Sequence, residues 1–285
     1  MSALFFGVLL MDESGLWICP ICGLPLTAAE KCWRCGRQHS FDRSRSGYVH
    51  LLPANRKHGK MPGDDKLIVD ARRRFLEGGW YAPLADALCA QVSSYMPAGG
   101  GLLDVGCGEG YYLRSVCPER DMIRIGFDLS KEAVLLAAKG DRRSTYFVGD
   151  LANIPLADGC CDAVLDVFTP ANYAQFGRIL KKDGVLIKLA PRPGYLRQLR
   201  EAAGGRLAAY DGAPVSDYAH AHLNVLEQRT ITYTMPVSGA LALHLAKMTP
   251  MLANIDADSL DLSSVTEITV DETMIVGTIK REEEL

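Results

Sequence analysis

The sequence has little of what membrane-spanning and secreted proteins need. It contains no apolar run close to the roughly 20 residues that cross a bilayer. The apolar N-terminal segment, residues 1–11, is too short to span and has neither a basic start nor a small-residue cleavage site. The 285 residues show no repeat or low-complexity stretch. These absences predict a globular, cytoplasmic protein with no membrane partner.

Cysteine is not scarce, but its placement does not suit a disulfide scaffold. Of the nine cysteines, four cluster between positions 19 and 35 and five are scattered through apolar segments. We expect the scattered ones to be small buried apolar side chains of a reduced protein. They are Cys89, Cys107, Cys117, Cys160 and Cys161.

The clustered cysteines have the spacing of zinc ligands. Cys19 and Cys22 form one Cys-x2-Cys pair, and Cys32 and Cys35 form another nine residues later. Four thiolates on two tight turns suit a tetrahedral structural Zn²⁺. His39 is a fifth candidate, so one of Cys32 and His39 is left out of a four-ligand site. Spacing alone prefers Cys32.

The small net charge of −3 hides an asymmetry. Residues 31–60 carry eight Lys or Arg and one acid, a net +7 that leaves −10 for the rest of the chain. A basic segment on an acidic body predicts binding to a polyanion such as RNA. The alternative is an ordinary solvated surface.

A glycine-rich loop follows a short apolar strand that carries Asp104. Gly106, Gly108 and Gly110 stand at alternate positions, as expected where a backbone turns tightly beside a ligand. A dinucleotide fingerprint would need its third glycine at Tyr111, so this loop does not match it. An acid before Gly-x-Gly-x-Gly instead resembles motif I of class I S-adenosylmethionine (SAM)-dependent methyltransferases.

Strands and helices alternate along the rest of the chain, which predicts a Rossmann-like α/β fold with a mostly parallel sheet. The seven expected strands are 102–105, 123–128, 145–149, 161–168, 185–190, 229–235 and 273–280. Ligands bind at the carboxyl ends of such strands. There Asp128 is placed to accept from ribose hydroxyls and Asp150 from the adenine amino group, with Leu151 beside the ring. Asp104 can orient the loop or the methionyl ammonium group.

Several motifs stand out along the chain: Cys19-x2-Cys22, Gly47-Tyr-Val-His-Leu-Leu52, Pro62-Gly-Asp64, Ala71-Arg-Arg73, Tyr81-x-Pro-Leu84 and the run from Asp104 to Tyr112. Together they resemble the RlmA family. Its bacterial members methylate N1 of guanine 745 or 748 in a hairpin loop of 23S rRNA. The exit Phe168-Thr-Pro-Ala-Asn172 looks closer to the subfamily that acts on 748.

The resemblance implies a class I SAM-dependent methyltransferase with a seven-stranded sheet and a small zinc ribbon. It implies SAM and a structural Zn²⁺ as cofactors and a 23S rRNA hairpin as partner, and it leaves a homodimer open. The implied zinc ligands are Cys19, Cys22, Cys35 and His39. The implied SAM contacts are Tyr81, Gly108, Glu109 and Tyr195, although a histidine is familiar at the last position.

We expect four regions: an extension at 1–11, a zinc-binding RNA-recognition domain at 12–52, a linker with capping helices at 53–98, and the methyltransferase domain at 99–285. Asp166, at the end of a strand, is the candidate acceptor for the proton of guanine N1. A backbone carbonyl near Phe168 or Thr169 is the alternative. Two other functions remain open: a small-molecule methyltransferase, and a non-catalytic SAM-binding zinc adaptor.

Overall fold

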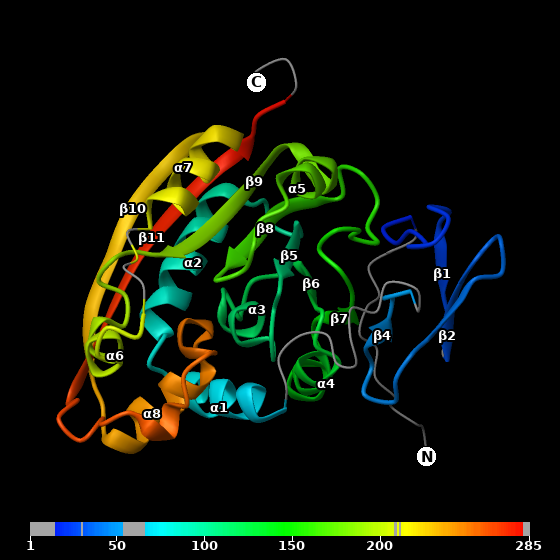
Figure 1. Cartoon of the computed structure of the whole chain (residues 1–285). Helices are drawn as coiled ribbons and strands as arrows, with labels where there is room; N and C mark the ends of the chain where they lie inside the picture. The colour runs from blue at the N-terminus through cyan, green and yellow to red at the C-terminus, as the bar shows by residue number, and fades with distance from the viewer. Residues whose placement is uncertain (1–14, 30, 54–65, 208–209, 211, 282–285) are drawn as a thin grey trace.

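The computed structural model describes residues 15–29, 31–53, 66–207, 210 and 212–281. The predicted extension and residues 54–65 of the predicted linker lie outside them. In the described part, an eight-stranded sheet is flanked by helices, and a three-stranded sheet packs at one edge (Figure 1). The strands of the large sheet, in spatial order, are β10 (Leu223–Pro236), β11 (Glu267–Ile279), β9 (Leu180–Pro191), β8 (Cys161–Val167), β5 (Gly101–Val105), β6 (Ile123–Asp128), β7 (Thr145–Val148) and β4 (Val49–His50).

The seven predicted strands are confirmed, with β9, β10 and β11 longer than expected. The strands from β9 to β4 run parallel, whereas β10 and β11 form an antiparallel pair at the other edge. Every residue of β5 and β8 is buried, as expected for central parallel strands covered on both faces. The sequence did not predict the eighth strand, β4, which comes from the zinc-binding segment.

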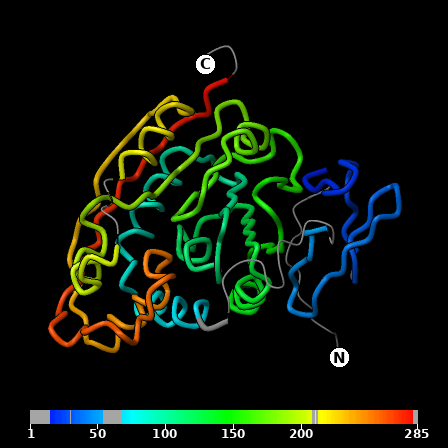
Figure 2. Tube along the Cα trace, viewed as in Figure 1, coloured from blue at the N-terminus to red at the C-terminus, as the bar shows by residue number. Residues whose placement is uncertain are grey.

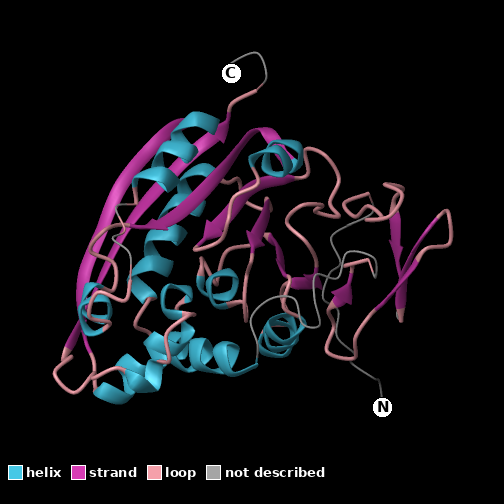
Figure 3. Cartoon of the chain, viewed as in Figure 1, coloured by secondary structure: helices cyan, strands magenta, loops and turns pink. Residues whose placement is uncertain are grey.

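Helices cover both faces of the sheet, and loops with short strands make up the zinc-binding segment (Figure 3). Helices α1 and α2 are the capping helices predicted within residues 53–98. Ser130 caps α4, because its side chain accepts from the Ala133 amide. The helices are α1 (Lys66–Glu77), α2 (Ala82–Tyr95), α3 (Tyr111–Ser115), α4 (Lys131–Gly140), α5 (Tyr173–Ile179), α6 (Arg197–Ala202), α7 (Ala213–His222) and α8 (Gly239–Met248). No described helix is long and apolar enough to cross a membrane.

Two distant parts of the chain meet beside the sheet. Helix α8 packs against α1 although more than 160 residues separate them (Figure 2). The Arg72 guanidinium donates to the Met248 carbonyl oxygen at 3.4 Å. The chain after α8 is thereby held next to the helix that the sequence predicted to cap the cofactor cleft.

One expectation about the cysteines is wrong. Cys89 on α2 and Cys117 after α3 form a disulfide, with Cα atoms 5.1 Å apart. The two residues lie in apolar surroundings, so their sequence context resembled that of buried thiols. Cys107 and Cys161 are free and buried as expected, and Cys160 is free and partly buried.

The zinc module, defined here as residues 15–53, is fixed to the edge of the large sheet. Its small sheet consists of β1 (Leu26–Ala28), β2 (Cys32–Cys35) and β3 (Ser40–Asp42). Trp17, 2% exposed, packs edge-on against Trp33 and Phe147 and so joins the module to β7. Parallel pairing of β4 with β7 adds backbone hydrogen bonds. The indole of Trp17 is thus buried between the module and the core.

Candidate active site and zinc centre

A cleft of about 400 Å³ opens at the carboxyl ends of β5, β6, β7 and β8. Nine of the ten residues predicted to bind SAM line it, and Gly110 lies just outside the lining. The nine are Tyr81, Asp104, Gly106, Gly108, Glu109, Asp128, Asp150, Leu151 and Tyr195. Arg72 and Leu76 of α1 also line the cleft, so α1 covers it as predicted.

The glycine loop needs its glycines. Gly106 has φ of +63°, and a Cβ there would lie 2.3 Å from Oγ1 of Thr169. Gly110 has φ of +81°, and its Cβ would lie 2.7 Å from the Tyr146 hydroxyl. A side chain at either position would combine backbone strain with a clash, so the tight turn beside the ligand depends on both.

Two carboxylates organise the floor of the cleft. Asp128 Oδ2 accepts from the Gly108 amide at 3.0 Å, and its Oδ1 accepts from the Ser130 amide at 2.7 Å. Asp104 is 1% exposed, and its Oδ2 has no hydrogen-bond partner. Burial, and then the negative charges of Asp128 and Glu109, raise the pKa of Asp104 well above its usual range.

An unpartnered buried carboxylate of this kind fits a bound cation. A positive charge in the cleft would lower the pKa of Asp104 again and satisfy the orphaned oxygen. SAM carries both an ammonium and a sulfonium group, so the donor set fits this cofactor. The Glu109 carboxylate, 3% exposed, lies 3.5 Å from Arg114, and burial raises its pKa. Asp150 Oδ1 accepts from the Ala152 amide at 2.9 Å.

An aromatic wall closes the other side of the cleft. The Tyr81 and Tyr195 hydroxyls are hydrogen-bonded at 2.8 Å. The Phe168 ring stacks on Tyr195 with 5.8 Å between centroids and 25° between planes, and it lies 6.4 Å from the Tyr112 ring. The tyrosine at position 195 therefore reaches the cleft in spite of the histidine familiar there.

Asp166, the predicted proton acceptor, does not line the cleft. Its side chain is 0% exposed. Its Oδ2 accepts from Nζ of Lys188 at 2.8 Å. Burial raises the pKa of Asp166, and the lysine opposes that rise. The carboxylate could reach a substrate only through Lys188.

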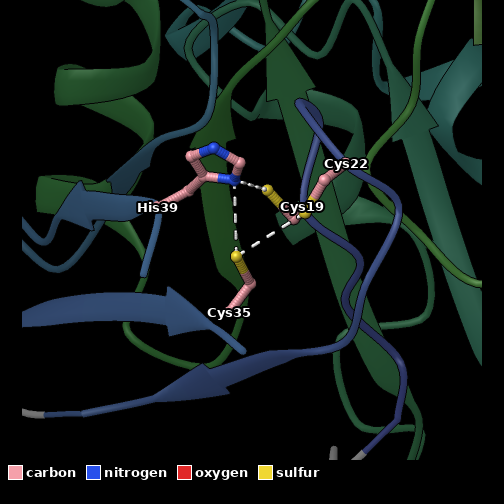
Figure 4. A group of neighbouring side chains, drawn as sticks. All are labelled: Cys19, Cys22, Cys35 and His39. Carbon is pink, nitrogen blue, oxygen red and sulfur yellow. Dashed lines mark hydrogen bonds between the residues drawn. The ribbon is translucent and has the colours of Figure 1, made fainter. Parts of the chain in front are cut away.

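The zinc ligands converge in the zinc module (Figure 4). One ligand atom each from Cys19, Cys22, Cys35 and His39 lies within 4.8 Å of the others. The Cys22 and Cys35 sulfurs are 3.7 Å apart, and His39 Nδ1 is 3.5 Å from the sulfurs of Cys19 and Cys35. Zn–S bonds of about 2.3 Å in a tetrahedron place sulfurs about 3.8 Å apart, so these residues fit Zn²⁺.

Cys32 does not belong to this cluster. Cys32 and Cys35 are the two ends of β2, and side chains three residues apart in a strand point to opposite faces. Cys35 faces the knuckle formed by Cys19 and Cys22, and His39 completes the set. The ligand set implied by the resemblance therefore holds, and the one preferred by spacing alone is wrong.

Comparison with known proteins agrees with this geometry. The profile described as RlmA, N-terminal, matches residues 17–60, and a methyltransferase-domain profile matches residues 103–187. The chain is 31% identical to the 23S rRNA (guanine(748)-N(1))-methyltransferase of Streptomyces fradiae, over 90% of this chain and 95% of the relative. It is 34% identical to YxjB of Bacillus subtilis, named as a candidate 23S rRNA (guanine-N(1)-)-methyltransferase, over 93% of this chain and 98% of the relative.

The chain belongs to the RlmA family. It is a SAM-dependent methyltransferase that carries a zinc ribbon, and the cleft and the cysteine–histidine cluster are the two sites such an enzyme needs.

Sequence reasoning missed several residues around the RlmA-family site. Lys188 lies in the apolar run of β9, where only its type sets it apart. Glu272 on β11 is 0% exposed and has no partner for either oxygen. Tyr210 and Tyr218 come from the segment around the unpredicted helix α7. A charged residue inside an apolar run was the available signal for Lys188.

Proposed function

We propose that this RlmA-family enzyme transfers the methyl group of SAM to N1 of a guanine, at position 745 or 748, in a hairpin loop of 23S rRNA in the cytoplasm. The names of the relatives support the reaction. The observation that carries the proposal is the fixed position of the cationic zinc module next to the cofactor cleft.

The module offers an array of cations to RNA phosphates. Five basic side chains on its strands and loops are exposed: Lys31, Arg34, Arg37, Arg43 and Arg45. Exposed Lys and Arg side chains on a folded surface bind RNA phosphates, and the affinity for RNA that they provide falls as salt concentration rises. Arg56, Lys57 and Lys60, from the same basic segment, lie outside the described residues.

The module also contacts a loop that leads away from the cleft. The Asn153 side chain donates to the Pro20 carbonyl at 3.0 Å, and the Ile18 amide donates to the Pro155 carbonyl at 3.1 Å. These bonds join the first zinc knuckle to the loop that follows Asp150 and Leu151. A hairpin held by the module would therefore present its loop beside the SAM site.

Catalysis in this arrangement consists mainly of positioning. SAM supplies an electrophilic methyl group, and the transfer needs N1 in line with the methyl carbon and sulfur. Asp104 would hold the ammonium group, Asp128 the ribose, and Asp150 with Leu151 the adenine. The Tyr81–Tyr195 pair would support the methionine end. Asp166 would act on the base only through Lys188, and water would take the N1 proton.

The test is methyl transfer to defined RNA. The protein is incubated with methyl-labelled SAM and transcripts of the 23S hairpin carrying guanine, or adenine, at 745 and at 748. Label should enter the RNA and reverse transcription should stop next to one of these guanines. Label that appears only in small molecules would favour the small-molecule alternative. Binding of SAM and RNA without transfer would favour the adaptor.

A further inference from the structure

A second cavity, of about 720 Å³, adjoins the cofactor cleft. The two hollows have a common wall, so a group bound in the second cavity lies directly beside the cofactor site. The shared residues are Phe168, Thr169, Pro170, Tyr195, Thr249 and Pro250. None of the roles assigned above to the cleft fills this space.

Its lining suits a nucleobase. Among the described lining residues there is no carboxylate, and the two cations are Lys188 and Arg200. Five aromatic rings line it: Phe168, Tyr173, Tyr195, Tyr210 and Tyr218. Bases that leave a helix or loop are held by stacking on such rings, and a wall without acids does not repel the attached phosphates.

Phe168 stands at the boundary between the two hollows. It has φ of +57°, a costly left-handed conformation for an aromatic residue, and its side chain is 36% exposed. The stacking of its ring on Tyr195 provides a flat surface at the point where a base would meet the methyl donor.

Lys188 supplies a buried, positively charged donor at the wall of the cavity. It is 4% exposed, and its Nζ donates to Asp166 Oδ2 at 2.8 Å and to the Thr169 carbonyl at 3.2 Å. An ammonium group has three donors, so one remains for the cavity that Lys188 lines. Asp166 lies opposite Lys188 in the register of β8 and β9 and fixes the position of the ammonium group.

We propose that the second cavity binds the flipped-out target guanine, with Lys188 donating to its O6 atom. This assignment rests on the proposed function and names the group that selects the base. Guanine presents an acceptor at O6, whereas adenine presents an amino donor at the same position, which an ammonium group rejects. Asp166 is a positioning residue, because it acts on the base only through the lysine.

The same contact assists the reaction. The methyl carbon leaves the sulfonium sulfur and bonds to N1, the N1 proton passes to water, and S-adenosylhomocysteine is the other product. Loss of the proton places negative charge on N1 and O6. A preorganised cation at O6 stabilises that charge where it develops.

The test compares bases and variants together. Removing the lysine alone would leave an unpaired buried carboxylate, so the variant is D166L/K188M, which removes both charges. The matched control is K181M, which breaks the Lys181–Asp162 ion pair (2.8 Å) between the same two strands but does not touch this cavity. Dissociation constants are measured for hairpins with guanine, inosine or 2-aminopurine at the target position. Inosine keeps O6 and 2-aminopurine lacks it.

In the wild type, 2-aminopurine should weaken binding relative to guanine by about tenfold or more, and inosine should change it little. In D166L/K188M the ratio of the dissociation constants for the 2-aminopurine and guanine hairpins should fall to near one. Turnover of this variant should drop by about 100-fold and recover as pH rises. K181M should keep the wild-type ratio whatever its overall RNA affinity. An unchanged ratio or an unchanged pH profile in D166L/K188M overturns the assignment.

Two further measurements keep the test decisive. Binding of S-adenosylhomocysteine shows that each variant is folded. If D166L/K188M does not bind S-adenosylhomocysteine, the variant Tyr218→Ala replaces it in the test. The Tyr218 ring is 54% exposed, so its removal should not disturb folding. That variant should lose RNA affinity and keep cofactor affinity, and unchanged RNA affinity overturns the pocket. If the wild type methylates no rRNA, the proposed function is wrong. If the wild type methylates guanine but D166L/K188M keeps the wild-type ratio of dissociation constants, only the proposed base pocket is wrong.

Discussion

Glu272 offers a sharp physical test of the core behind the active site. It lies within β11 at 0% exposure, and neither carboxylate oxygen has a hydrogen-bond partner. Burial, followed by the negative charge of Asp271, raises its pKa well above the ordinary value. Glu272→Gln keeps the shape of the side chain and removes its ionisation.

The sign of the effect follows from proton linkage. Because the folded chain holds this proton more tightly than the unfolded chain, the stabilisation is complete below the unfolded pKa of about 4.3. It is lost as pH rises toward the raised, folded pKa. For each pH unit between the two pKa values, the free energy of unfolding of the wild type falls by about 1.4 kcal/mol relative to that of the glutamine variant. Two such units correspond to about 3 kcal/mol, or about 6–10 °C in Tm.

The assay is thermal unfolding followed by circular dichroism between pH 5 and pH 9. The Tm of Glu272→Gln should exceed that of the wild type by an amount that grows with pH and then levels off. Glu267→Gln is the matched control, because Glu267 is exposed on the same strand. Parallel curves for wild type and Glu272→Gln across this range would refute the reasoning, since an ordinary pKa leaves no pH-dependent gap.

Three other predictions test the sites. Cys35→Ser should lose bound zinc, whereas Cys32→Ser should retain it, and mass spectrometry of the metal measures both. Loss of zinc from Cys32→Ser would favour the ligand set that contains Cys32 in place of His39. Gly106→Ala should lower affinity for S-adenosylhomocysteine by tenfold or more in calorimetry, because its Cβ would lie 2.3 Å from a threonine oxygen; unchanged affinity would contradict the tight-loop argument. Arg43→Glu with Arg45→Glu should weaken hairpin binding and flatten its salt dependence while sparing cofactor affinity, and equal binding at 50 and 200 mM salt would argue against a phosphate-binding module.

The elements that the sequence predicted are those with strong local signals. The β5 strand and its glycine loop combine an apolar run with a conformation that few residues adopt. Helix α7 was missed because its apolar face is weak, with only Ala219 buried. The two-residue strand β4 has almost no local signal, and only its pairing with β7 makes it a strand. Tertiary contacts of this kind are not visible in a single sequence.

The site residues divide in the same way. Acids at strand ends were predictable because parallel strands align their carboxyl ends. The choice between Cys32 and His39 required knowing that residues 32–35 form a strand and not a turn. Asp166 and Lys188 lie in buried, apolar stretches of β8 and β9, and their pairing depends on the register of these two strands, which spacing along the chain does not contain. A buried charge in an apolar strand nevertheless implies a nearby partner, so the existence of a pair could have been inferred.

The cofactor cleft lies at the carboxyl ends of the parallel strands, and the zinc module lies beside it at the β4 edge of the sheet. All strands from β9 to β4 run parallel, so the chain leaves each of them on the same side. Strand β4 belongs to the zinc module and pairs with β7 at the end of that sheet. The hydrogen bond from the Asn153 side chain to the Pro20 carbonyl joins the module to the loop that follows β7. The zinc module is therefore held beside the strand end that carries Asp150, next to the cofactor cleft.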